Sequence, residues 1–439
     1  MKKTISLMAI AAFLTGGLLF GQEAEPAAAP APAPEVKSTG SDVKVSGFVR
    51  ARGSVRQNAD WDANAADTKE SVENKTQVTI SKDLGENSKV VVTLQDNRVW
   101  GSYPDISGVK KDETRTTNNT NEAGATGGIG FDAREAYLQV GNIFGQPLAI
   151  TMGRQKLVYG NQRLLGHLDW TSEGRSFDGL KLNYDMKDVN TLDVFTMILN
   201  ENEAAKDKTF TGIYDTLKVI GLVHLDVYFL NVFEKEVENK NTIGGRLTNK
   251  ADKGVLDDFP LKALDFNIEY AMQNGNKGLQ KLEGSLFALD AGYTIGLGGD
   301  MKLRIGFEHI IASGDNTVDT ADVQEGFQQL YGTNHAHMGI SDTWLAFNDV
   351  NATSVSLTFA LNKELSLQYA YWTFAENYIV AGAFDTKGAE QDFVVTYKPR
   401  KGLAVQLGYA LVTPSEDTVN TDPEAADQTF AYLSTMYKF

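Results

Sequence analysis

The sequence predicts a transmembrane antiparallel β-barrel of about 18 strands, because segments of about ten residues alternate apolar and polar side chains along residues 43–439. Two further observations support a barrel. Long connections alternate with short ones, and the chain ends in an alternating strand with a terminal aromatic residue. No apolar run in this region is long enough for a membrane helix, and only helices and closed barrels pair every backbone group inside a membrane.

The first part of the chain has the pattern of a secretory leader followed by a tether. Two lysines precede an apolar run from Ile5 to Phe20, and Gly21 is a plausible cleavage point. A retained anchor is the weaker alternative, because the run is short for a spanning helix. The next stretch is rich in Pro and Ala, which keeps it extended, and it is too short for the plug of a TonB-type transporter. We expect a signal peptide over 1–21, a linker over 22–42 and one barrel over 43–439.

The composition excludes several kinds of function. Without cysteine the chain has no disulfide, thiolate nucleophile or Cys-based metal site. A net charge of −16 argues against nucleic acid as a partner. His335 and His337 lack an identifiable third metal ligand, which favours packing or hydrogen bonding for both. His167 and Asp169 are not accompanied by a nucleophile motif. We therefore expect no catalytic residues, no metal and no cofactor.

About eighteen segments carry the alternating pattern, an even number as single-chain bacterial barrels require. In residues 364–374, for example, Leu365 and Leu367 share one face while Ser366 and Gln368 share the other. The predicted strands are 43–56, 72–82, 87–97, 131–141, 147–157, 175–184, 190–199, 212–220, 222–232, 241–248, 261–272, 284–295, 300–312, 351–361, 364–374, 389–398, 402–412 and 428–439.

The connections fall into two classes. If the chain starts in the periplasm, the long gaps face outside and the tight turns face the periplasm, as in outer-membrane barrels. The gap 249–260 breaks this rule, so either that turn is unusually long or the strands beside it are misplaced. The long outside gaps are 57–71, 98–130, 158–174, 200–211, 313–350, 375–388 and 413–427; the short turns are 83–86, 142–146, 185–189, 296–299, 362–363 and 399–401.

The C-terminal strand carries a second signal. Leu433, Tyr437 and Phe439 fall on one face of this strand. A terminal Phe with Tyr two residues before it resembles the C-terminal signal that the barrel-assembly machinery reads. We therefore expect this machinery, together with outer-membrane lipid and lipopolysaccharide, as partners.

The polar face of the strands should line a water-filled lumen, because a charged side chain facing lipid costs about 2–4 kcal/mol near the membrane midplane. Arg50, Arg52 and Arg56 lie opposite valines of the first predicted strand. Charged rings of this kind select permeants in channels, but cross-strand pairing that holds the lumen together explains them equally well. Other inward cations are Lys181, Arg246 and Arg304; the inward acids are Glu135, Asp226, Asp265, Glu269, Asp290 and Glu308.

Two loop motifs carry a family resemblance. Residues 153–166 read GRQKLVYGNQRLLG and are followed by Trp170 and by GRSFDG at 174–179. Residues 327–339 read FQQLYGTNHAHMG, with Gly332 where a Pro is common. Both stretches resemble motifs of the alginate-export porin family. The resemblance implies an eighteen-stranded barrel with loops folded over or into the lumen, and the passage of an anionic polysaccharide.

In that family, arginines line the constriction and meet uronate carboxylates, a role that the forked guanidinium suits. The motif match transfers this role to Arg154, Arg163 and Arg175, and less specifically to Arg134. Arg154 shares the strand face of Met152, so it reaches the lumen only if it lies beyond the membrane rim.

The sequence therefore favours a passive outer-membrane channel for polar or anionic solutes, with export of an anionic polysaccharide such as alginate as one form of it. An oligosaccharide or a small anionic solute is the expected permeant. The alternative is a structural or adhesive barrel whose long loops bind a surface partner. Acidic residues such as Asp60 and Asp322 gather in these loops, where solvated charge is favoured over cation binding.

Overall fold

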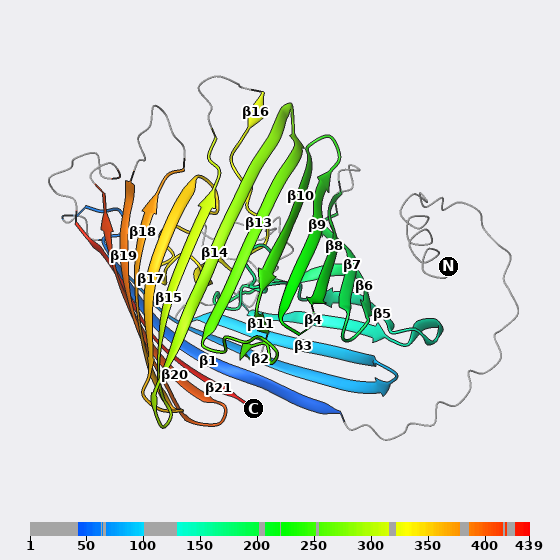
Figure 1. Cartoon of the computed structure of the whole chain (residues 1–439), viewed down its shortest axis with the longest axis horizontal. Helices are drawn as coiled ribbons and strands as arrows, with labels where there is room; N and C mark the ends of the chain where they lie inside the picture. Colours follow the sequence, from blue (N-terminus) through cyan, green and yellow to red (C-terminus); the bar gives the residue numbers. More distant parts are fainter. Residues whose placement is uncertain are drawn as a thin grey trace, which may run out of the picture. The chain divides into compact units, whose positions relative to one another are not determined.

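The chain forms a closed antiparallel β-barrel of 18 long strands (Figure 1). The computed structural model describes residues 43–62, 64, 67–100, 130–201, 207–219, 221–251, 254–315, 322–377, 386–415, 418 and 426–439. The expected signal peptide (1–21) and linker (22–42) lie outside these residues. Within the described part, no helix is long and apolar enough to cross a membrane.

Every predicted strand is present, which confirms the fold class. The barrel strands are β1 (Lys44–Gln57), β2 (Lys69–Gly85), β3 (Ser88–Val99), β4 (Gly130–Val140), β5 (Leu148–Gln155), β6 (Phe177–Asp185), β7 (Asn190–Asn200), β8 (Lys208–Val219), β9 (Val223–Glu234), β10 (Glu238–Thr248), β13 (Leu264–Lys277), β14 (Gln280–Gly298), β15 (Met301–Ala312), β17 (Val350–Ala360), β18 (Leu365–Ala375), β19 (Thr386–Arg400), β20 (Leu403–Pro414) and β21 (Gln428–Lys438). The short elements are β11 (Lys250–Ala251), β12 (Gly254–Val255) and β16 (Val323–Gln324), with 3₁₀ turns η1 (Ile143–Gly145) and η2 (Asn334–Ala336).

The barrel closes where its first strand meets its last. β1 pairs antiparallel with β21, with Val49 opposite Tyr437. The backbone N–H of Phe439 donates to the carbonyl of Gly47 at 3.0 Å, and the reverse bond measures 3.1 Å. Within the described residues each of the 18 barrel strands therefore pairs with a neighbour on both sides, as strands that cross a membrane must. Leu433, Tyr437 and Phe439 are all exposed on the outer face.

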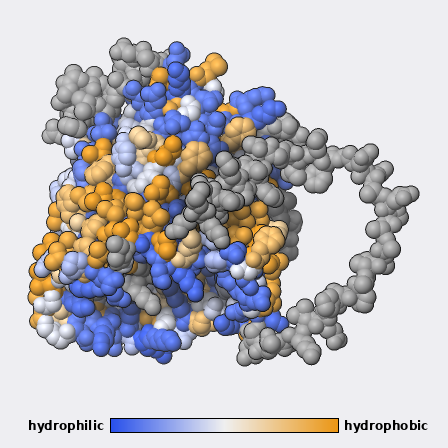
Figure 2. All heavy atoms as spheres, turned by 45° about the vertical axis from the view of Figure 1, so that its right-hand side comes forward, coloured by the Kyte–Doolittle hydropathy of each residue, from blue (hydrophilic) through white to orange (hydrophobic). Residues whose placement is uncertain are grey.

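The two faces of the strands differ as the alternation predicts. On β1, Val45 and Val49 are 60 % and 45 % exposed, whereas Arg50 and Arg52 are 8 % and 9 % exposed. The apolar side chains therefore point outward and the arginines point into the barrel. Figure 2 shows the result on one face of the molecule, where a hydrophobic band lies between hydrophilic zones at either end.

Adjacent residues of β17 provide a direct test of this assignment. Val355 is exposed on the outer face, and Ser356 lines a cavity in the lumen. We expect Val355→Lys to lower the free energy of unfolding in lipid bilayers by about 2–4 kcal/mol, because its charge would face lipid. Ser356→Lys, the matched control, should change it by less than about 1 kcal/mol. Urea titration of the liposome-inserted barrel measures both, and equal effects would contradict the assignment of the faces.

One end of the barrel carries the short turns and the other carries the long loops. Strands β9 and β10, and β13 and β14, continue further than predicted on the long-loop side, so their connections shrink to 235–237 and 278–279. On the short-turn side, residues 249–263 are the exception. They contain the hairpin β11–β12, which shows that this turn is unusually long and that the neighbouring strands were correctly predicted.

Candidate functional site: a loop-lined constriction in the lumen

Two long connections fold into the barrel and meet there. We call residues 156–176, between β5 and β6, inner loop 1, and residues 322–349, between β15 and β17, inner loop 2. Leu165 forms a bridge with Tyr331, and the backbone N–H of Tyr331 donates to the carbonyl of Leu164 at 2.9 Å. The N–H of Thr333 donates to the carbonyl of Gln162 at 2.8 Å. The loops thus join in a short backbone ladder across the lumen.

Apolar packing attaches this ladder to the barrel wall over a wide arc, from β6 to β18. Leu165 of inner loop 1 and Phe327 of inner loop 2 are buried together with inward residues of β6, β7 and β8, among them Phe195, Met197 and Phe210. The polar face of the strands was expected to make the whole lumen polar. Part of the lumen is instead filled with apolar side chains. The missed signal is residues 194–199 (VFTMIL), where both strand faces carry apolar side chains, as they do in strands buried on both sides.

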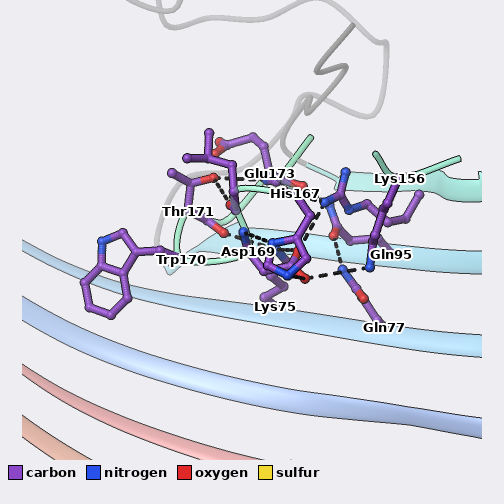
Figure 3. A network of polar contacts seen from close by, with 12 residues as sticks. Lys75, Gln77, Gln95, Lys156, His167, Asp169, Trp170, Thr171 and Glu173 are labelled. Carbon is purple, nitrogen blue, oxygen red and sulfur yellow. Dashed lines mark hydrogen bonds and ion pairs between the residues drawn. The ribbon is translucent and has the colours of Figure 1, made fainter. Parts of the chain in front are cut away.

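Asp169 is the main electrostatic anchor of inner loop 1 (Figure 3). Its Oδ1 lies 3.3 Å from Nζ of Lys75 and 3.1 Å from a guanidinium nitrogen of Arg134, and its Oδ2 lies 3.7 Å from Nζ of Lys156. Arg50 donates to the backbone carbonyl of Asp169 at 2.9 Å. Burial disfavours the charge of Asp169, but the surrounding cations outweigh it and hold its pKa well below the ordinary value.

Arg134 reaches this network because of a β-bulge. The register between β3 and β4 shifts between Thr93 and Leu94, so that Arg134 has no partner in the ladder. Both Arg134 and its neighbour Glu135 consequently point inward, which simple alternation forbids. The guanidinium of Arg134 also donates to the Ser176 hydroxyl at 2.6 Å.

Arg163 is buried and links inner loop 1 to the barrel wall at β13 and β15. It is 1 % exposed, and its guanidinium lies 3.1 Å from Glu269 and 2.9 Å from Glu308. Burial opposes its charge, but the two carboxylates raise the pKa of Arg163 above its ordinary value. His337 shares Glu308 at 2.9 Å. Arg163 therefore fixes the position of the loop, and its burial leaves no face for a solute.

Arg175 joins the two inner loops. Its guanidinium donates to the carbonyls of Tyr331 and Gly332, the latter at 3.0 Å. Burial lowers its pKa to about 10. A Cβ at Gly332 would overlap the carbonyl oxygen of Arg163, which explains why this position departs from the proline common in the resembled motif.

Trp170, at the tip of inner loop 1, lies between the arginines of β1 and inner loop 2. The guanidinium of Arg52 is 4.0 Å from its ring centroid, and His335 stacks on the indole at 3.7 Å. Groups of this size cannot share one ring face at such distances, so they occupy opposite faces. The indole N–H donates to Asp342 at 3.0 Å, and His335 bonds to the same carboxylate at 2.7 Å. Figure 3 shows the indole pointing away from the Asp169 network.

Both loop histidines are thus engaged in hydrogen bonds, and the described residues contain no cluster of three His, Asp or Glu side chains suited to a metal ion.

Three cavities follow one another along the lumen. The outer cavity, of about 290 Å³, is lined by Arg52, Arg56 and Trp170, among others. The middle cavity, of about 490 Å³, is also lined by Trp170, and the inner cavity, of about 690 Å³, lies toward the short-turn side. Lys250 and Asp290 line both the middle and the inner cavity. Because neighbouring cavities share wall residues, they lie next to one another in the lumen.

The remaining arginines and lysines suggested by the sequence lie apart from one another. Lys181 is 3.6 Å from Asp193 on the next strand. Arg246 binds Asp226 and lines the inner cavity, and Arg304 binds Asp265 and lines the middle cavity. Arg56 donates to Gln428 at 2.7 Å and to the carbonyl of Ser341.

The structure does not place Arg154, which the motif assigned to the constriction, among the residues that line the three cavities. It shares the outer face of β5 with Met152, which is 54 % exposed, and pairs with Asp178 of β6 at 2.7 Å. Inward positions of β5 belong to Thr151 and Gln155. Strand parity, which placed Arg154 beside Met152, was the correct guide.

Sequence reasoning did not assign a role in the lumen to Trp170, Lys250 or Asp169. In the sequence, Trp170 stood out only as part of a loop motif, and Asp169 only as a neighbour of His167. Their roles could not be assigned because their partners lie on distant strands. Lys250 had one signal, the long turn that breaks the rule of short connections.

Comparisons with known proteins agree with this architecture. OccK9 (OpdG) of Pseudomonas aeruginosa superposes with a TM-score of 0.58 at 14 % identity, covering 91 % of this chain and 98 % of that one. OccK2 (OpdF) of the same organism, solved in complex with glucuronate, gives 0.57 at 13 % identity with 91 % and 98 % covered. These likenesses show the fold. None of the curated proteins matches the chain significantly. The family model described as "Alginate export" matches residues 42–432, nearly the whole barrel, so this chain belongs to the alginate export family and is an outer-membrane channel.

Proposed function

We propose that this outer-membrane channel passes small acidic sugars, of the uronate class, by passive diffusion through the three cavities. The observation that carries the proposal is the outer cavity, in which Arg52 lies 4.0 Å from the ring centroid of Trp170 and Arg56 lies 4.8 Å from that of Phe430. Arg52 pairs with Glu73 of the same cavity and donates to the carbonyl of Trp170 at 3.0 Å, and its remaining N–H groups are free to bind a solute carboxylate. The aromatic rings hold both guanidinium planes in place beside the opening.

The middle cavity suits the uncharged part of such a solute. Ser354, Ser356, Gln368, Gln406 and Tyr432 line it with hydroxyl and amide groups, which match sugar hydroxyls. Its volume of about 490 Å³ falls within the usual range of small-molecule sites. Because OccK2 (OpdF), which resembles this chain in fold, was solved with glucuronate, a uronate is a reasonable first ligand to test.

The inner loops favour a short solute over a long polymer. Arg163 and Lys75, which attach inner loop 1 to the wall, are 0 % exposed in their side chains. Displacing such buried pairs is costly, so we expect the constriction to keep its width while solutes pass. Passage requires no chemical step on the solute.

The matched pair Arg52→Gln and Arg154→Gln tests the proposal. Single-channel currents of the refolded protein in planar bilayers should show anion preference and block by glucuronate. Arg52→Gln should weaken this block about tenfold, equivalent to about 1.4 kcal/mol, because one charge-assisted carboxylate contact is lost. Arg154→Gln should leave the block unchanged, since Arg154 lies on the outer face.

The alternatives give different results. Open channels that glucuronate does not block would indicate a general or neutral-sugar porin. A folded barrel without conductance would support the structural or adhesive function. Equal effects of the two substitutions would refute the assignment of Arg52.

The partners follow from the same proposal. We infer that the assembly machinery reads the exposed Phe439 and that lipid and lipopolysaccharide surround the outer band. We also infer removal of residues 1–21 on export, which the N-terminal sequence of the mature protein would test.

A further inference from the structure

We propose that the long turn 249–263 on the short-turn side carries a second carboxylate-binding site, formed by Lys250 together with Arg304, where the middle cavity meets the inner cavity. The ligand class is the carboxylate of an acidic sugar that enters from the short-turn side. This inference rests on the proposed function and adds a selectivity element outside the two loop motifs at 153–179 and 327–339.

The turn is built to hold its hairpin in one place. Asn249 is fully buried, its amide donates to the carbonyl of Leu264 at 2.9 Å, and its side-chain oxygen accepts the N–H of Phe266 at 2.8 Å. The N–H of Leu256 donates to the carbonyl of Asn249 at 2.8 Å, which closes the base of the hairpin. The residue that follows this anchor is Lys250, which lines the middle and inner cavities.

Asp265 orients both cations of the site. Its Oδ1 lies 3.1 Å from Nζ of Lys250 and 2.7 Å from a guanidinium nitrogen of Arg304, and its Oδ2 accepts from Nε of Arg304 at 2.9 Å. The side chain of Asp265 is 9 % exposed, against 41 % for Lys250 and 27 % for Arg304. The acid therefore lies behind the cations, and the positive groups face the cavity.

Lys250 is more exposed than the cations of the other ion pairs described in the lumen, including Lys181 at 25 %. Arg163 and Arg246, which also pair with wall acids, are 0 % and 11 % exposed in their side chains. Asp290, 3.5 Å from Arg304 and 22 % exposed, lines both cavities, and Glu308 and Asp392 line the middle cavity but not the inner one. A carboxylate in the cavity can thus reach Lys250 and Arg304 without displacing Asp265.

The experiment measures glucuronate block from each side of a planar bilayer. The chain has no cysteine, so Leu279→Cys at the fully exposed tip of the β13–β14 hairpin, labelled with an impermeant reagent, fixes the sidedness. We expect Lys250→Gln to raise the dissociation constant of glucuronate about tenfold when glucuronate is added from the short-turn side. When glucuronate is added from the long-loop side, the dissociation constant should rise less than about twofold. Lys250→Arg, which keeps the charge, should retain block like that of the native chain.

Lys262→Gln is the matched control. Lys262 belongs to the same turn, but its ammonium donates to the backbone carbonyls of Leu256 and Asp257, and it lines none of the three cavities. If Lys250→Gln behaves like Lys262→Gln while the native channel is blocked by glucuronate, the second site is refuted and the proposed function stands. If glucuronate blocks the native channel from neither side, the proposed function fails and the second site fails with it.

Discussion

Asp169→Asn is expected to release inner loop 1 from the barrel wall and to raise single-channel conductance severalfold. The change removes the carboxylate shared by Lys75 and Arg134, whose side chains are 0 % and 4 % exposed. Breaking a buried ion pair leaves uncompensated charge at a cost of about 3–5 kcal/mol, and the partial exposure of Asp169 reduces this to about 2–4 kcal/mol. The strands keep their own hydrogen bonds, so the loop moves while the barrel persists.

Planar-bilayer recordings check this result. Asp178→Asn is the control, because Asp178 is an acid of the same chain region whose partner, Arg154, lies on the outer face. We expect the native conductance and anion preference in Asp178→Asn, and larger, noisier and less selective currents in Asp169→Asn. Indistinguishable channels from the two variants would show that Asp169 does not hold the constriction.

The same network gives the channel a defined response to acid. The folded-state pKa of Asp169 is held below its ordinary value near 3.9. A group of this kind contributes its full stabilisation above the unfolded-state pKa and loses it as the pH falls through the folded-state pKa. The difference in conductance between the native chain and Asp169→Asn should therefore persist down to about pH 4 and be lost only in stronger acid. A difference that vanished between pH 5 and 6 would contradict the depressed pKa.

The sequence was a reliable guide to the wall of the barrel because one rule governs it. Every strand separates lipid from water, so Val49 and Arg50 must point in opposite directions, and parity assigned them correctly. The rule fails where the backbone departs from regular pairing, as at the bulge beside Arg134. At Arg154 the parity rule agrees with the structure better than the motif does. A motif match gives the identity of a residue but not the direction of its side chain.

The contents of the lumen were harder to predict. The motif assigned Arg163 a contact with the solute, whereas in the structure its contacts are Glu269 and Glu308, which come from strands far along the chain. Their meeting depends on how inner loop 1 folds back into the barrel, which local pattern does not determine. A motif arginine could therefore be named in advance, whereas its role as a buried strut required the three-dimensional arrangement.

Arg163→Met is the substitution for which we expect the largest loss of stability. It leaves Glu269 and Glu308 in a buried environment without their shared cation, and such losses cost about 3–5 kcal/mol. We expect a lower free energy of unfolding in urea together with a more mobile inner loop 1, seen as faster hydrogen exchange over residues 156–176. Arg98→Ala, which removes a pair with Asp96 whose arginine is 52 % exposed, should change stability by less than about 1 kcal/mol.

A further variant separates the loss of a charge from the loss of packing. In Arg163→Met combined with Glu269→Gln and Glu308→Gln, no uncompensated charge remains among the three residues. Because neutral groups can replace a buried ionic triad with little loss, the triple variant should recover most of the stability that the single change removes. Without such recovery, the stabilising contribution of Arg163 would lie in the shape of its side chain and not in its charge, and its two carboxylate contacts would be incidental to the position of the loop.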